Sequence, residues 1–202
     1  MHKAEIFRYA DNPRKLERLS TKRRPHGSTL PRKVLVPTVG AMVSRITIDD
    51  VASFAAVKRI KPIGILPPEL SEDSFKRGIQ KTIGEPGEFK DWGGERSDLF
   101  STRLRIKQKR LAAAFAFKGP GLKGKLVIGK MGKNGDQAPR LFQEEADVFF
   151  VQHWREIDAS VLDLMRSLAV AKSVTTGRQI WYGIIDGQDS ERLRQAYRKN
   201  FS

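Results

Sequence analysis

Residues 99–118 decide the fold of this chain, and they read LFSTRLRIKQKRLAAAFAFK. Residues 99–106 alternate between apolar and polar side chains, which is typical of a half-buried strand. Residues 110–118 form a nearly continuous apolar run, which is typical of a buried strand. The polar residues 107–109 between them predict a turn. The stretch therefore predicts an antiparallel hairpin, whose outer ends meet at the same end of a sheet.

Helices and further strands are predicted on both sides of this hairpin. Ser71 is a suitable N-cap for a helix that ends at Ile83, and Asp136 for a helix from about Gln137 to Glu144. Residues 34–48 favour short strands, followed by a short helix through Val57 that Asp49 or Asp50 can cap. Four more elements are expected, namely buried strands at 147–153 and 180–185, an amphipathic helix at 158–172 and a last helix capped by Ser190. This order predicts an α/β fold with a mixed sheet.

The charge of the chain is strongly positive. Its 202 residues include 38 Lys and Arg against 23 Asp and Glu, which gives a net charge of +15 and a pI near 10.3. A polyanion is the natural partner, because each neutralised phosphate releases bound counterions. No apolar run reaches membrane-spanning length and no signal-peptide core is present, so we expect a soluble, cytoplasmic protein without a membrane partner. The absence of cysteine excludes disulfides and cysteine-ligated zinc.

Two segments are candidates for gripping nucleic acid. Residues 1–33 carry ten basic and three acidic residues and several prolines, which predicts a basic arm ahead of a single α/β domain at 34–202. The segment at 119–135 interleaves glycines with lysines, which suits a loop that follows phosphates. The alternatives for the arm are a solvated tail or a segment that covers a sheet edge, and the alternative for the loop is a solvated, flexible segment. The candidate phosphate-binding residues are Lys22, Arg23, Arg24, Lys123, Lys125, Lys130 and Lys133.

The hairpin predicts a cluster of polar side chains at one end. Asp98 precedes the first strand and Lys118 ends the second, so both are expected at the same end of the sheet. Gln137 opens the next predicted helix. A carboxylate beside a lysine suits metal-assisted phosphodiester hydrolysis, because carboxylates hold Mg²⁺ and lysine offsets charge on the phosphate. Turn chemistry, a solvated strand end and an ordinary first helical turn are the alternative explanations of these three residues.

The segment GGERSDLF…AAAFAFKG resembles the PD-(D/E)XK superfamily of restriction-endonuclease-like nucleases. The resemblance covers roughly residues 70–155 and implies an αβββαβ core, a Mg²⁺ or Mn²⁺ cofactor and DNA as the favoured substrate. Asp98 then matches the metal-binding aspartate, and Lys118 matches the lysine of the acid-x-Lys triplet. Gln137 matches a glutamine that some members carry on the following helix.

The acid of that triplet is missing, since Ala116 stands where the superfamily has a carboxylate. Either Glu95 or Glu85 supplies the second metal ligand from another position, or catalysis has been lost. We therefore expect a metal-dependent DNA endonuclease of restriction, defence or DNA-processing type. The alternatives are a catalytically degenerate nucleic-acid-binding protein and a basic subunit of a nucleoprotein assembly. The oligomeric state stays open, with a homodimer among the options.

Overall fold

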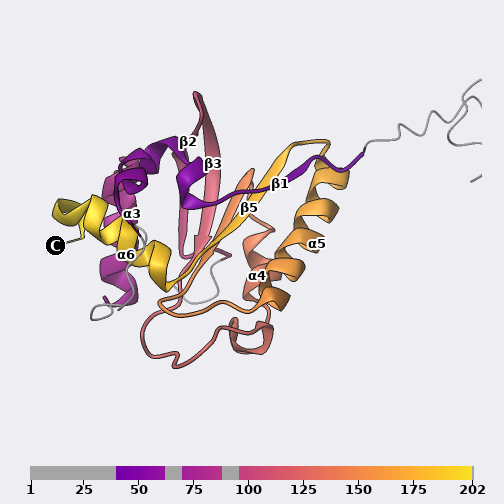
Figure 1. Ribbon diagram of the computed structural model, residues 1–202. Coiled ribbons are helices and arrows are strands. Elements are labelled where there is room, and N and C mark those ends of the chain that lie inside the picture. Colours follow the sequence, from indigo (N-terminus) through magenta and orange to yellow (C-terminus); the bar gives the residue numbers. More distant parts are fainter. Residues whose placement is uncertain (1–39, 62–69, 88–95, 202) are drawn as a thin grey trace, which may run out of the picture. The chain divides into compact units, whose positions relative to one another are not determined.

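A mixed five-stranded sheet forms the centre of the protein (Figure 1). The computed structural model describes residues 40–61, 70–87 and 96–201. The sheet order is β1-β5-β4-β3-β2, in which β2 runs antiparallel to β3 and the other neighbouring pairs are parallel. The strands are β1 (Val43–Arg45), β2 (Leu99–Ile106), β3 (Lys109–Ala116), β4 (Val148–Gln152) and β5 (Ile180–Ile185). The predicted α/β class with a mixed sheet is confirmed.

Helices cover both faces of this sheet. The first core contains α3 (Glu72–Ile83), α6 (Gly187–Ala196) and the 3-10 helix η2 (Ala52–Arg59). The second contains α4 (Gln137–Leu141) and α5 (Ala159–Thr176). Three further 3-10 turns are η1 (Ile48–Asp50), η3 (Ile128–Lys130) and η4 (Arg198–Asn200).

Strand β3 divides its side chains between the two cores. Phe115 and Phe117 lie in the first core, whereas Ala114 and Ala116 lie in the second. This alternation follows from the two-residue period of a strand. Aromatic rings fill one side of β3, and alanines on the other side leave room for α4 to pack closely. Residue 118 consequently belongs to the α4 face.

The predicted hairpin is confirmed, with small differences at its ends. Leu99 pairs with Phe115 and Ile106 with Lys109. Strand β3 ends at Ala116, two residues earlier than predicted. The N–H of Lys118 nevertheless donates to the carbonyl oxygen of Gln152 at 3.1 Å, so the chain still runs beside β4 at that point.

Helix α3 also has its predicted bounds. The Ser71 hydroxyl accepts a hydrogen bond from the N–H of Ser74 at 3.1 Å, which satisfies one of the amides left open at the helix start. Gly84 ends the helix in the left-handed conformation, at φ 71°. The cap places Glu72 as the first residue of the helix.

Several predicted caps were wrong. The last helix begins at Gly187 and is capped by Asp186 rather than Ser190, because the Asp186 carboxylate accepts the N–H of Asp189 at 2.9 Å. The helix through Val57 is η2, which follows Val51 and has no side-chain cap. Asp49 and Asp50 lie instead within η1, where Asp50 forms a capping box with Thr47. In each case the competing acid or hydroxyl also suited a cap, and the local sequence did not rank them.

The implied αβββαβ core is not reproduced in the described residues. Between α3 and α4 these residues hold two strands, whereas the resemblance implies three. The basic arm 1–33 lies outside the described residues, together with Lys22, Arg23 and Arg24. Within the described ranges, no helix combines the length and apolar character that crossing a membrane would require.

Candidate active site

Asp98 lies immediately before β2, opposite the end of β3. Its N–H donates to the carbonyl oxygen of Phe115 at 2.9 Å, and its Oδ2 accepts the N–H of Phe117 at 2.6 Å. Strand β2 does not reach far enough to pair with Phe117, so the carboxylate takes the hydrogen bond that a strand residue would otherwise take. This contact positions Asp98 at the open end of the hairpin.

Glu72 reaches the same segment from α3. Its Oε2 accepts the N–H of Gly119 at 2.9 Å. Phe117 and Gly119 are alternate residues of an extended stretch, so their amide nitrogens face the same side and lie about 7 Å apart. The amide of Lys118 between them faces β4. Glu72 and Asp98 therefore bind neighbouring positions along one open edge of the chain.

The absence of a side chain at Gly119 allows this approach. A Cβ at position 119 would lie 3.2 Å from both the Cβ and the Oε2 of Glu72. Contacts this short would require the Glu72 side chain to shift by a few tenths of an ångström. The sequence feature Lys118-Gly119 thus serves the geometry of Glu72, which lies 47 residues earlier in the chain.

Electrostatic interactions link Glu72 to both predicted residues of the hairpin end. Burial raises the pKa of Glu72, and the nearby charge of Asp98 raises it further. The hydrogen bond from Gly119 and the positive charge of Lys118 act in the opposite direction. Lys118 is half-buried and, among the described residues, forms no ion pair within 4 Å. Its positive charge therefore acts on Glu72 without an ion pair between the two side chains.

Gln137 joins this group from the start of α4. Its Nε2 donates to Oδ2 of Asp98 at 3.2 Å. Its Oε1 is buried and has no hydrogen-bond partner in the described part of the chain. Since buried polar atoms are nearly always paired, this oxygen marks a place where another donor or a cation would be expected.

The structure joins Asp98 to Gln137 by a hydrogen bond and places Glu72 where the charges of Asp98 and Lys118 both act on it. Sequence reasoning missed Glu72 because it looks like an ordinary first-turn acid. Asp73 occupies the same turn and is equally suited to the helix dipole, yet it is exposed. Only the packing of α3 against the end of β3 separates the two.

The other predicted carboxylates do not join the group. The Oε2 of Glu85 accepts the Ser101 hydroxyl at 2.8 Å, and its Oε1 accepts the N–H of Gly87 at 3.1 Å. Ser101 lies three residues along β2 from Asp98, which corresponds to about 10 Å. Glu85 is therefore held at the opposite end of α3 from Glu72. Glu95 lies outside the described residues.

The glycine-rich loop after β3 is attached to the segment that follows β4, through an isolated β-bridge between Leu126 and Ile157. Lys125 forms ion pairs with Glu156 at 2.9 Å and Asp158 at 3.0 Å, so its charge is already compensated. The fully buried His153 lies 2.9 Å through its Nε2 from the carbonyl oxygen of Gly124. Three lysines of this loop are exposed and form no ion pair with a described residue, namely Lys123, Lys130 and Lys133.

The donor set at the hairpin end fits a hard divalent cation. The described residues contain no group of three His, Cys, Asp or Glu side chains arranged for a metal. Mg²⁺ does not need one, because proteins commonly hold it through one or two carboxylates and leave the remaining positions to water and phosphate. Glu72 and Asp98 supply two carboxylates, and the unpartnered Oε1 of Gln137 supplies a neutral oxygen.

Comparisons with protein-family models, with curated proteins and with solved structures find no match to this chain. The functional interpretation therefore depends on the side chains described above. Their arrangement combines paired carboxylates, a lysine held apart from them and a basic chain.

Proposed function

We propose that this protein is a metal-dependent nuclease that hydrolyses phosphodiester bonds of DNA. One observation carries the proposal: Glu72 and Asp98 accept the amides on either side of Lys118, so two carboxylates and a lysine share one end of the hairpin. The high positive charge of the chain supports a polyanionic substrate.

Glu72 and Asp98 would hold the metal ion, with Oε1 of Gln137 as a further oxygen. A divalent cation bound there would polarise the scissile phosphate and favour ionisation of an attacking water. The chain's own contribution is orientation. The Phe117 amide and Gln137 hold Asp98, and the Gly119 amide holds Glu72, so neither carboxylate has to be reoriented when substrate binds.

Lys118 would act on the substrate phosphate. A cation that is not consumed by an ion pair can orient the attacking water and offset the negative charge that builds up on the phosphate. Its backbone is held in place by the hydrogen bond to Gln152 of β4. The side chain is thereby anchored at its base while its charged end stays available.

Glu72 also accounts for the missing acid of the triplet. Ala116 is fully buried against α4, where an ionised carboxylate would lose its hydration. A glutamate from the first helix can approach from the edge of the chain instead. In this proposal the second carboxylate comes from Glu72, in place of the predicted Glu85 or Glu95.

The test compares four purified full-length variants on supercoiled plasmid and on end-labelled duplex DNA, with Mg²⁺ or Mn²⁺. We expect Glu72→Gln, Asp98→Asn and Lys118→Met each to lower the cleavage rate on the order of 10²–10³-fold. Glu85→Gln is the matched control, since it removes a carboxylate of similar burial outside the group, and it should cut like wild type. Loss of cleavage in Glu85→Gln with full activity in Glu72→Gln would refute the assignment.

A second candidate function is nucleic-acid binding without chemistry. The alanine at position 116 and the lack of a third carboxylate among the described residues favour it. A chain of this kind would bind DNA with a steep salt dependence and cut neither DNA nor RNA with any divalent metal. The plasmid experiment separates the two functions, because wild-type protein is assayed for binding and for cleavage on the same substrate.

A further inference from the structure

The turn end of the β2–β3 hairpin gathers positive charge, at the opposite end from Asp98. Residues 99–135 contain ten Lys and Arg and no Asp or Glu. Figure 1 shows that this hairpin projects beyond the rest of the sheet, and β3 pairs with β4 only from Ala113 onward. Four exposed cations lie at the projecting end, which we call the hairpin tip: Arg105, Lys107, Lys109 and Arg110.

The hairpin tip is arranged at a cost to stability. Arg105 and Arg110 are direct cross-strand partners, so their side chains leave the same face of the hairpin. Like charges in this position repel each other. Within the described ranges, none of the four tip cations forms an ion pair. Arg103 lies two residues before Arg105 on β2 and does have a partner. Its guanidinium donates to the carbonyl oxygen of Gly84 at 3.0 Å.

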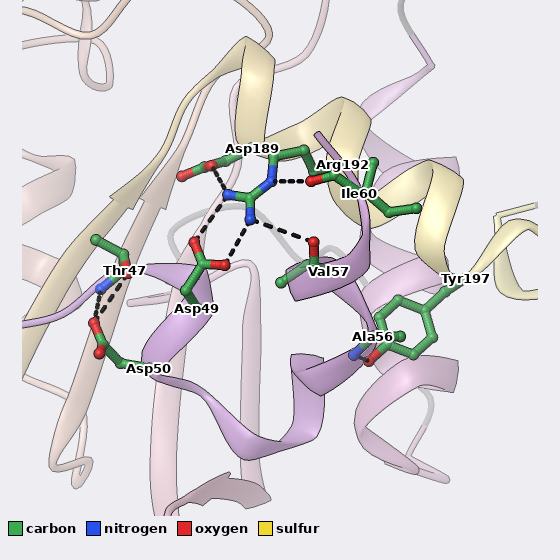
Figure 2. A network of polar contacts seen from close by, with 9 residues as sticks. All are labelled: Thr47, Asp49, Asp50, Ala56, Val57, Ile60, Asp189, Arg192 and Tyr197. Atoms are coloured by element: carbon green, nitrogen blue, oxygen red, sulfur yellow. Dashed lines mark hydrogen bonds and ion pairs between the residues drawn. The ribbon is translucent and has the colours of Figure 1, made fainter. Parts of the chain in front are cut away.

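Two more exposed cations lie on the Ile106 side of the hairpin, opposite to the face that carries Arg105 and Arg110. Arg45 and Lys58 join Lys107 around a hollow of about 380 Å³. Two acids also line it; Arg192 compensates the charge of Asp49, whereas the partners of Asp50 are uncharged. Asp49 accepts two hydrogen bonds from Arg192, and Asp50 accepts the N–H and hydroxyl of Thr47, as Figure 2 shows.

The rest of the fold holds the hairpin tip in place. Ile106 forms a β-bridge with Val51, and the N–H of Arg105 donates to the Ser53 hydroxyl at 2.9 Å. The cations therefore extend from a backbone that is attached to η2. The positive charges of the hairpin tip are held on a fixed backbone and have no acidic partner among the described residues. Such a surface suits a partner that carries regularly spaced negative charge.

We propose that the hairpin tip is a docking surface for the phosphate backbone of double-stranded DNA, and that the same duplex passes the Asp98 end. This inference rests on the proposed nuclease function. Arg110 and Lys118 lie on the same face of β3, eight residues and thus about 27 Å apart. Phosphates of one strand repeat every 3.4 Å, so both ends are reached only by a duplex of about eight base pairs or more.

Other polyanions fit the hairpin tip less well. A membrane surface would favour apolar side chains beside the cations, yet the exposed large hydrophobics of the described residues are Met42 and Val174, which are not part of the hairpin. A single strand or an acidic polypeptide is flexible and does not need two sites at a fixed separation. A duplex is stiff over tens of base pairs, so it can bridge both ends.

The experiment measures equilibrium binding of full-length protein to fluorescent duplexes of about 6, 10 and 16 base pairs, in EDTA and across a salt series. Wild type should bind the two longer duplexes much more tightly than the shortest. Arg105→Gln/Arg110→Gln should make the slope of log K against log salt less negative by about 1.8, or 0.9 for each lost phosphate contact. Its melting temperature should be unchanged or higher, because a repulsive pair is removed.

The matched control is Arg166→Gln/Arg198→Gln, which removes two exposed arginines on α5 and η4. It should change the slope by less than half as much. An equal change in both variants would overturn the proposal. So would a hairpin variant that keeps duplex binding while losing affinity for polyglutamate or for phosphatidylserine vesicles.

Because binding is measured without metal, the outcome is independent of cleavage. If the wild type binds duplex DNA but never cuts it, and the hairpin variant loses this binding, the docking proposal is supported and only the nuclease proposal is refuted. If the wild type does cut, the hairpin variant should raise KM on long duplexes and leave kcat at saturation unchanged.

Discussion

Two acidic side chains in this protein, Asp49 and Glu72, have opposite surroundings. Asp49 and Asp189 flank Arg192, whose guanidinium donates to both oxygens of Asp49, at 2.6 and 2.9 Å, and to Asp189 at 3.1 Å (Figure 2). The hydrogen bond from Arg192 holds the pKa of Asp49 below its usual value. Glu72, in contrast, has a backbone amide as its hydrogen-bond partner, and burial together with the charge of Asp98 raises its pKa.

The difference is the one expected between an acid that stabilises the fold and an acid with the metal-binding role that we propose for Glu72. Arg192 also donates to the carbonyl oxygens of Val57 and Ile60, so it ties α6 to η2 while neutralising acid charge. A cation supplied by the chain stabilises the fold at all times. At Glu72 the chain supplies no such ion pair among its described residues, which suits a site that receives its cation from solution.

Removing the arginine should have the largest effect on stability. We expect Arg192→Met to lower the free energy of unfolding by about 3 kcal/mol, because it leaves two acids facing each other and two carbonyl oxygens without their donor. This loss of stability is at the low end of the range expected when one partner of a buried ion pair is removed, since the Asp49 side chain is 39% exposed. Urea denaturation measures the loss, with exposed Arg166→Met as the control. An unchanged midpoint would show that the network contributes nothing to the fold.

The pH dependence of stability tests the environment of Asp189, the second acid beside Arg192. Burial, and next the charge of Asp186, raise the pKa of Asp189 to about 6. A raised folded-state pKa means that the folded protein binds more protons than the unfolded chain between about pH 4 and 6. Stability should therefore fall as pH rises through this window, by about 2 kcal/mol after allowance for partial exposure.

Urea denaturation at several pH values measures this slope. Asp189→Asn should flatten it, while Asp163→Asn, an exposed acid on α5, should leave it intact. If the slope persists in Asp189→Asn, another titrating group causes it. Glu72 is the first group to examine, because its pKa is raised as well.

The smallest expected effect has the opposite sign. Glu72→Gln should raise the stability of the metal-free protein by less than about 1 kcal/mol, since it removes a half-buried acid whose charge is disfavoured by that of Asp98. Mg²⁺ should raise the melting temperature of wild type, less so at pH 5 than at pH 8, and should not affect Glu72→Gln. Stabilisation of wild type and variant by the same amount would place the cation elsewhere.

Local patterns predicted much of the secondary structure. The alternation of residues 99–106 and the apolar run after it were sufficient for the hairpin, and the Ser71 cap was sufficient for α3. The caps at Asp186 and Thr47 were missed, because several side chains of similar chemistry stand within a few residues of each start. Strand order could not be predicted either, since β1 lies beside β5, which begins 137 positions later, and no local pattern encodes that pairing.

The positive charge of the chain, its hairpin and the placement of Asp98 and Lys118 at one end follow from the sequence alone, because composition and the two-residue strand period determine them. The identity of the second carboxylate beside Asp98 does not follow from the sequence. The sequence offered Glu85 and Glu95 nearby, whereas the structure brings in Glu72, because α3 packs with its first turn against the end of β3 and Gly119 leaves room for the side chain. Contacts of this kind depend on how distant elements pack, and only the tertiary structure decides them.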